Sequence, residues 1–188
     1  MTYLGEHGDV SAVVRNDLPQ LSITPTTGTA CTFVAPGSIT NGEYGLFRWD
    51  MPPNVPGAGA HFHRGFSEAF YVLSGTVTFE NGAGQVVLSE GGFLYVPPGG
   101  IHGFANPSDQ PASMLILFSP GISRERYFEE LSEIRHSGRE LTDQEWADLF
   151  APRPGQPLSG RTEMVLLLVL GVGLLVLARI SHRRPTAS

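Results

Sequence analysis

The sequence predicts an all-β protein built around one closed barrel, and two observations predict it. The 188 residues include 23 Gly and 15 Pro, a content of turn-forming residues that is typical of a chain of short strands. From residue 10 to residue 118, short apolar or alternating runs follow one another every ten residues or so, the pattern of a sandwich or barrel. The chain is long enough for one domain with its own core and a terminal appendage.

Turn signals separate the apolar runs, among them Asn41-Gly42, Asn81-Gly82 and Gly91-Gly92. No part of this stretch has the helical period of 3.6 residues. We therefore assign residues 1–120 to a barrel domain that includes N-terminal strands. The expected strands are residues 10–14, 21–24, 30–34, 44–50, 60–63, 68–73, 77–80, 85–89, 93–96, 101–104 and 113–118.

The pattern changes to helix after Pro120-Gly121, and residues 121–150 form an expected helical extension. Ser123 is a suitable N-cap for a first short helix, which Gly138 ends. Its apolar face carries Tyr127, Leu131 and Ile134 at positions i, i+4 and i+7, so we expect it to pack outside the barrel. Thr142 and Glu145 then have the spacing of a capping box and predict a second short helix.

The C-terminal part divides into a linker, an apolar segment and a basic tail. Residues 151–163 are rich in Pro and Gly, as expected of a linker, and residues 181–188 form the tail. Residues 164–180 predict a hydrophobic helix that is apolar all round, and we expect it to span a membrane. The alternative is a helix docked at an oligomer interface, for which a homodimer is the simplest assembly.

The expected location is therefore membrane-associated through this single C-terminal helix. The N-terminus has no basic start followed by an apolar run, which argues against a secretory signal peptide and places the barrel in the cytoplasm. The arginines that follow the apolar segment favour the opposite orientation, but their excess over those that precede it is slight.

Charge and composition exclude several functions. The net charge is -6 and the sequence pI about 5.4, so the chain lacks the basic surface that nucleic-acid binding requires. All 12 basic residues are Arg, which excludes Schiff-base chemistry and the P-loop lysine. The single Cys31 has no partner for a disulfide and is expected to be a buried, inert thiol.

Four residues form a candidate metal site. His61 and His63 are two apart, so on a strand they point to the same side, and Glu68 starts the next strand. His102 follows a Pro and Gly turn and enters another strand. Imidazole and carboxylate ligands suit first-row transition metals, here Fe, Mn, Ni, Co, Cu or Zn. The alternative is that the first two histidines lie exposed on an edge strand and that His102 is a hydrogen-bonded core residue.

These residues resemble the two signature motifs of the cupin superfamily over roughly residues 40–120. The first motif reads His61-x-His63-x4-Glu68-x6-Gly75, and the second reads Gly91-x5-Pro97-x-Gly99-x2-His102-x3-Asn106. One position departs from the family pattern, because Val55 stands where the first motif normally opens with Gly. The resemblance implies a double-stranded β-helix, or jelly-roll, barrel that holds one divalent transition metal through the four residues named above.

Within the superfamily the chain looks most like the single-barrel cupins similar to quercetin 2,3-dioxygenase. That resemblance implies a metal-dependent dioxygenase acting on a phenolic or enol small molecule that chelates the metal, with Glu68 as a candidate general base. If the paired histidines face inward, strand parity lines the substrate pocket with five apolar residues, namely Phe47, Trp49, Phe70, Val72 and Phe104.

Two other functions stay open. A non-enzymatic cupin that senses a small ligand or a metal at the membrane fits the same residues. An isomerase or epimerase of a sugar-like substrate also fits the fold, although it would be expected to have a more polar cavity. Arg64, beside the ligand strand, is either a binder of an anionic substrate or a solvated loop residue.

Overall fold

The computed structural model describes residues 5–121, 124–142, 144–145 and 149. Ten strands, one α-helix and one 3-10 helix are assigned in this part of the chain. In chain order they are η1 Gly5–His7, β1 Gln20–Thr24, β2 Thr29–Ala35, β3 Gly45–Met51, β4 Val55–Pro56, β5 Ser67–Ser74, β6 Thr76–Glu80, β7 Gln85–Ser89, β8 Phe93–Val96, β9 Gly103–Asn106, β10 Ala112–Ser119 and α1 Arg124–Ser137.

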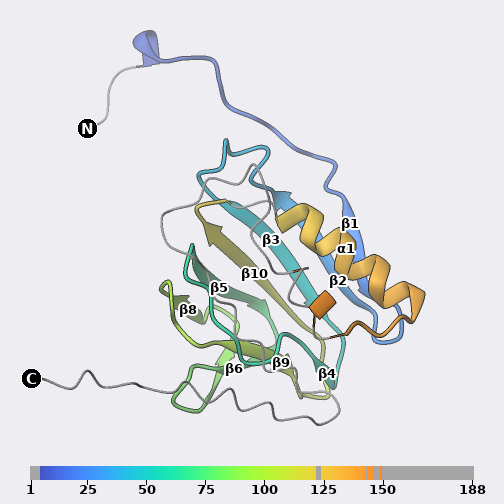
Figure 1. Ribbon diagram of the computed structural model, residues 1–188. Coiled ribbons are helices and arrows are strands. Elements are labelled where there is room, and N and C mark those ends of the chain that lie inside the picture. The colour runs from blue at the N-terminus through green and yellow to red at the C-terminus, as the bar shows by residue number, and fades with distance from the viewer. Residues whose placement is uncertain (1–4, 122–123, 143, 146–148, 150–188) are drawn as a thin grey trace, which may run out of the picture.

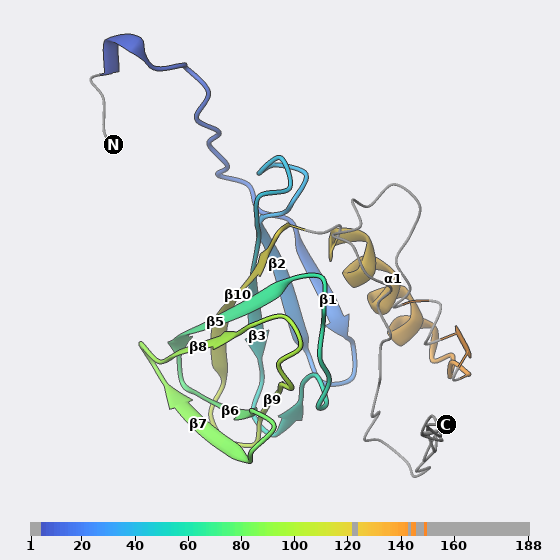
Figure 2. The same ribbon diagram turned by 60° about the vertical axis from the view of Figure 1, so that its left-hand side comes forward.

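The strands form two antiparallel sheets that face each other, and the prediction of an all-β jelly-roll barrel is confirmed. The larger sheet has the order β1-β2-β3-β10-β5-β8 and the smaller one the order β4-β9-β6-β7. Strands distant in sequence are neighbours, since β10 pairs with both β3 and β5. Figure 2 shows β5 to β9 surrounding one end of the barrel, while β1 and β2 extend the larger sheet beyond it.

The inner face of the larger sheet carries a layer of large apolar side chains that pairing brings into line. Phe47 on β3 lies opposite Phe33 on β2 and Ile116 on β10, and Ile116 lies opposite Phe70 on β5. Phe47 and Phe70 are 0% and 1% exposed. Because side chains alternate between the two faces of a strand, this register directs every second residue of four strands into one core.

Helix α1 covers the part of this inner face that the smaller sheet leaves open. Phe128 is buried and its ring lies 5.1 Å from that of Phe47, and Ser132 donates a hydrogen bond to the carbonyl of Ser22 at 2.7 Å. Figure 1 shows the helix alongside β1. We expected this helix to pack outside the barrel, but it packs against the inward face of the larger sheet, because β1 and β2 extend beyond the smaller sheet.

Two helix-end signals of the sequence are present where the structure describes them, one at the C-terminus of α1 and one after it at the start of the expected second helix. Gly138 follows the last residue with a φ of +66°, the left-handed conformation of a helix C-terminus. Thr142 and Glu145 form the expected reciprocal capping hydrogen bonds, from the Glu145 amide to Thr142 Oγ1 at 3.3 Å and from the Thr142 amide to Glu145 Oε2 at 2.9 Å. The expected N-cap, Ser123, lies outside the described residues.

Two expected strands are wrong. Residues 10–14 are not a strand, because they run away from the barrel with no partner strand in the described part of the chain, and Val10, Val13 and Val14 are exposed (Figure 1). Residues 60–63 make only an isolated bridge at His61, and the neighbouring short strand is β4 instead. The glycines and prolines that surround these residues favour turns over a continuous ladder.

The expected membrane-associated location is contradicted. Within the described part of the chain, no helix is long and apolar enough to cross a membrane. Helix α1 has 14 residues, which span only about 21 Å against a hydrocarbon core of about 30 Å, and it carries several charged side chains. The linker 151–163, the apolar segment 164–180 and the tail 181–188 lie outside the described residues.

We predict that Phe47→Ala destabilises the fold by about 3–5 kcal/mol, because it removes a ring from a fully enclosed site that cannot collapse around the loss. The matched control is Phe93→Ala, since Phe93 is 61% exposed and should change stability by less than about 0.5 kcal/mol. Urea unfolding of the two variants measures both effects. Equal losses would contradict the position of the core.

Candidate metal centre

Four side chains converge at one end of the barrel interior. His61, His63, Glu68 and His102 each offer one ligand atom, and these atoms all lie within 4.8 Å of one another. Glu68 and His102 are buried, at 6% and 2% exposure, and the other two histidines are half-buried. Of the two orientations left open by the sequence, the structure has the inward one.

Backbone hydrogen bonds bring these residues together. His61 and His102 form an isolated antiparallel bridge, in which each amide donates to the other residue's carbonyl at 2.8 Å. The Gly99 amide donates to the carbonyl of His63, which joins the second histidine to the same turn. Glu68 reaches the cluster from β5, where it lies opposite Val96 of β8.

Two of the imidazole rings are oriented by their second nitrogen. His61 Nδ1 lies 2.7 Å from the carbonyl oxygen of Gly59, and His102 Nδ1 lies 3.0 Å from that of Gly100. A carbonyl oxygen only accepts, so both rings donate from Nδ1. Their Nε2 atoms are then left for the centre of the cluster, an arrangement that is usual for metal-binding histidines.

The centre of the cluster contains buried polar atoms that fit a bound cation. Glu68 Oε2 and His102 Nε2 are enclosed and form no regular hydrogen bond within the described residues, although the two atoms touch each other. His63 Nε2 lies 3.7 Å from Glu68 Oε2. Buried polar atoms without a partner are costly, and a cation shared between them removes that cost. The donor set of three imidazoles and one carboxylate suits a first-row transition metal.

The electrostatic environment leaves two histidines neutral and ready to bind a metal. Burial lowers the pKa of His61, as does the neighbouring His102. Burial also lowers the pKa of His63, together with the positive charge of Arg124. For His102, burial opposes protonation, but the direct contact with the Glu68 carboxylate and its negative charge outweigh burial and raise the pKa. A proton on His102 therefore occupies the position that a metal would take.

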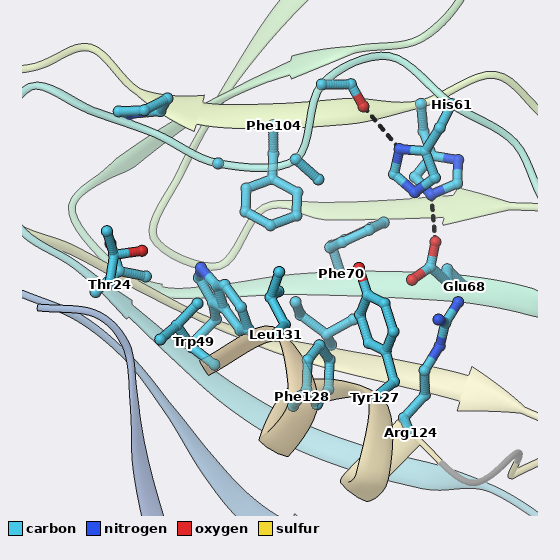
Figure 3. Close-up of a pocket in the computed structure, with 18 of the residues that line it drawn as sticks. Thr24, Trp49, His61, Glu68, Phe70, Phe104, Arg124, Tyr127, Phe128 and Leu131 are labelled. Carbon is cyan, nitrogen blue, oxygen red and sulfur yellow. Dashed lines mark hydrogen bonds and ion pairs between the residues drawn. The ribbon is translucent and has the colours of Figure 1, made fainter. Parts of the chain in front are cut away.

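A cavity of about 260 Å³ opens beside the cluster. Trp49, Phe70 and Phe104 line it, together with all four residues of the cluster (Figure 3). Phe47 and Val72, which we expected in the pocket, are instead fully buried in the core, at 0% exposure each. They lie on the inward face as parity requires, but other side chains separate them from the cavity, as the Phe128 ring does over Phe47.

No pattern in the amino-acid sequence indicated that α1 would form one wall of this cavity. Arg124, Tyr127, Phe128 and Leu131 line it from the helix, and Figure 3 shows Arg124 reaching toward Glu68. An Arg124 guanidinium nitrogen lies 3.3 Å from His63 Nε2, and its carbon lies 4.7 Å from the centre of the Phe66 ring. The only signal was the apolar face with Tyr127 and Leu131, which indicated burial but not the surface it would cover.

Arg64 and Cys31, the other residues noted in the sequence, are not part of the cluster. Arg64 is exposed, with its guanidinium 5.5 Å from the centre of the Phe62 ring. Cys31 is a free thiol at 0% exposure, and burial raises its pKa, so it is the inert core residue that was expected. Apart from the histidines, the charged side chains among the described residues that line the cavity are Glu68 from the barrel and Arg124 and Arg135 from α1.

A family model described as "Cupin domain" matches residues 47–118. The match includes all four residues of the cluster, and it supports the membership of the cupin superfamily that the two motifs predict. No curated protein matches the chain.

Three solved structures illustrate what the chain is similar to. An RmlC-like cupin from Shewanella frigidimarina is 21% identical, with 65% of this chain and 93% of that chain covered and a TM-score of 0.49. A predicted oxalate decarboxylase from Thermotoga maritima is 19% identical, with coverage of 58% and 99% and a TM-score of 0.49. A conserved protein with a double-stranded β-helix domain from Klebsiella pneumoniae is 22% identical, with coverage of 49% and 76% and a TM-score of 0.43.

We predict that the full-length protein binds about one transition-metal ion per chain, and that His61→Ala and His102→Ala each lose most of it. Mass spectrometry of the purified variants measures the metal. The matched control is His7→Ala, because His7 is exposed and far from the cluster along the chain. A His61→Ala, His102→Ala double variant that keeps a full complement of metal would refute the ligand assignment.

We also predict that metal affinity rises with pH. The pKa of His102 is raised above its ordinary value of about 6.5, so below that pKa the metal must displace a proton, whereas the lowered pKa values of His61 and His63 keep those rings neutral. Cobalt titrations between about pH 5.5 and 8.5 should show tighter binding and less proton release as the pH rises. A pH-independent affinity would contradict protonation of His102 in the metal-free protein.

Proposed function

Since residues 47–118 are a cupin domain whose four clustered side chains face a cavity, we propose that this protein is a metal-dependent dioxygenase. Its substrate is a phenolic or enol small molecule that chelates the metal, as in the cupins similar to quercetin 2,3-dioxygenase. The observation that carries the proposal is the direct continuity between the ligand cluster and an aromatic-lined cavity, because a purely structural metal site has no need of one.

The shape and composition of the cavity support a flat substrate. Phe70 and Phe104 lie 6.0 Å apart between their ring centres, and Trp49 lies edge-on to Phe104 at 6.0 Å. Phe128 closes the opposite side from α1, with its ring centre 5.5 Å from that of Trp49. Aromatic walls stabilise planar rings by dispersion and by edge-to-face contacts. A sugar-like substrate would require more hydrogen-bonding groups along these walls.

The charge near the cluster supports an anionic head group. Arg124 and Glu68 lie on the same side of the cavity as the histidines (Figure 3). A guanidinium in a partly enclosed site pairs well with a phenolate or enolate oxygen, because it donates charge-assisted hydrogen bonds. Three cation–π contacts, with Phe66, Phe118 and Tyr127, hold this guanidinium in position.

The four clustered residues would hold the metal, which supplies charge stabilisation for the chelating oxygens and a site for dioxygen. Glu68 Oε2 is the candidate base that takes the proton of the substrate hydroxyl, since it is a buried carboxylate oxygen at the centre of the cluster. The aromatic walls exclude water from the reacting groups. Both oxygen atoms of dioxygen enter the product and the substrate supplies the electrons, so no external reductant is required.

We predict that the metal-loaded full-length protein consumes dioxygen when a flavonol such as quercetin is added, as measured with an oxygen electrode. The His63→Ala variant should lose this activity together with its metal. Arg124→Gln should keep the metal but lower kcat/KM by about 10–100-fold, because it removes a charged hydrogen bond worth about 1.5–3 kcal/mol from the substrate oxygen.

Two outcomes would contradict the dioxygenase proposal. Metal-loaded protein that binds flavonols tightly but consumes no dioxygen would favour a sensor that reads ligand or metal. Metal-loaded protein that neither binds nor oxidises flavonols or small enediols, but interconverts sugar-like substrates, would favour an isomerase or epimerase. Neither outcome bears on the four metal ligands, which the metal measurements described above test separately.

A further inference from the structure

The indole N–H of Trp49 is a buried donor that finds no partner. Trp49 is 6% exposed, and its Nε1 atom forms no hydrogen bond within the described part of the chain. More than nine in ten buried polar groups in proteins are paired, and leaving a donor unpaired costs about 1–3 kcal/mol. This donor lies on β3, and neither the fold nor the proposed reaction uses it.

The surrounding side chains fix the orientation of this indole. The Phe104 ring stands edge-on to it at an interplanar angle of 80°, and the Phe128 ring packs beside it at 5.5 Å. On β2, Cys31 is the residue paired with Trp49, and its fully buried side chain restricts movement from that side. An aromatic face is at best a weak acceptor, so the packing positions the N–H without replacing a hydrogen bond.

Trp49 lines the cavity at the end opposite His61 and Glu68 (Figure 3). Figure 3 shows its ring nitrogen on the side that faces the space below Phe104, with Thr24 nearby, while His61 and Glu68 lie at the other end. Thr27 and Thr29 also line the cavity, with their hydroxyl oxygens 3.2 Å apart. The cavity therefore has a polar group at each end and aromatic walls between them.

We propose that Trp49 Nε1–H is a specificity-determining donor for an oxygen acceptor at the far end of the bound ligand. The ligand class is then a planar molecule with a metal-chelating enol or phenol at one end and a hydroxyl, carbonyl or ether oxygen at the other. Small acids and unsubstituted aromatic chelators leave the indole unpaired and bind less tightly. The chelating group of this ligand rests on the proposed function, whereas its oxygen acceptor is inferred from Trp49 alone.

The test compares two flavonols that share a chelating group. Quercetin carries oxygen atoms on its outer rings, and 3-hydroxyflavone does not. Binding of each is measured by titration calorimetry to the full-length protein loaded with zinc, which gives affinities without turnover. We expect Trp49→Phe, which keeps the aromatic packing and removes the N–H, to weaken quercetin binding about 5–10-fold and 3-hydroxyflavone binding less than about 2-fold.

A second readout follows the donor directly. The protein contains two tryptophans, so the Trp49 indole signal in a proton–nitrogen NMR spectrum is the one that Trp49→Phe removes. Quercetin should move this signal downfield, as a new hydrogen bond does, and 3-hydroxyflavone should move it much less. Removal of the unpaired donor opposes the packing that the smaller Phe ring loses, and a thermal melt of ligand-free Trp49→Phe protein checks that the fold is retained.

The results separate this inference from the proposed function. Equal weakening of both flavonols by Trp49→Phe, or no downfield shift with quercetin, would overturn the inference even if dioxygen is consumed. Selective weakening of quercetin without any dioxygen uptake would support the donor role and contradict the dioxygenase. Failure of either flavonol to bind the wild-type protein would overturn the ligand class proposed for Trp49.

Discussion

The candidate site depends on the pair of backbone hydrogen bonds between His61 and His102. These bonds join the loop before β5 to the turn before β9, two segments far apart in the sequence, and they place two imidazoles side by side next to Glu68. The ring centres of His61 and His102 lie 4.2 Å apart as a result. Because Glu68 is fixed independently by its pairing on β5, the loop and the sheet must meet in one register for four ligand atoms to share a centre.

The same site shows why polar groups are tolerated inside an apolar barrel. The carbonyl oxygens of Gly59 and Gly100 pair with the outer nitrogens of two histidines, so only the inward atoms are left without a regular partner. Asn106, at the end of the second motif, is fully buried but donates to the carbonyls of Pro52 and Gln110 and accepts from Ser108. One motif residue is therefore paired within the fold, whereas the inward atoms of the cluster require a proton or a cation.

The cavity exists because the two sheets differ in extent. The larger sheet extends past the smaller one, so part of its aromatic inner face needs another cover, and α1 supplies it. This arrangement brings Arg124 and Tyr127 next to the candidate metal ligands, all four of which belong to the barrel. Phe47 is fully enclosed in the core, whereas Trp49, two residues along the same strand, lines the cavity.

The sequence by itself determined the strand-rich barrel, the turns at its glycines and the four residues of the cluster. These features follow from local rules, since alternation, turn residues and ligand spacing act over a few positions. Only the tertiary structure decided which inward side chains reach the cavity. The alternation of side chains along a strand shows which face a residue is on, but not whether other side chains cover it. The tertiary structure also decided that residues 10–14 find no partner strand in the described part of the chain and that the amphipathic helix covers the inner face of the sheet. Both outcomes depend on the space left by other strands, which no local pattern records.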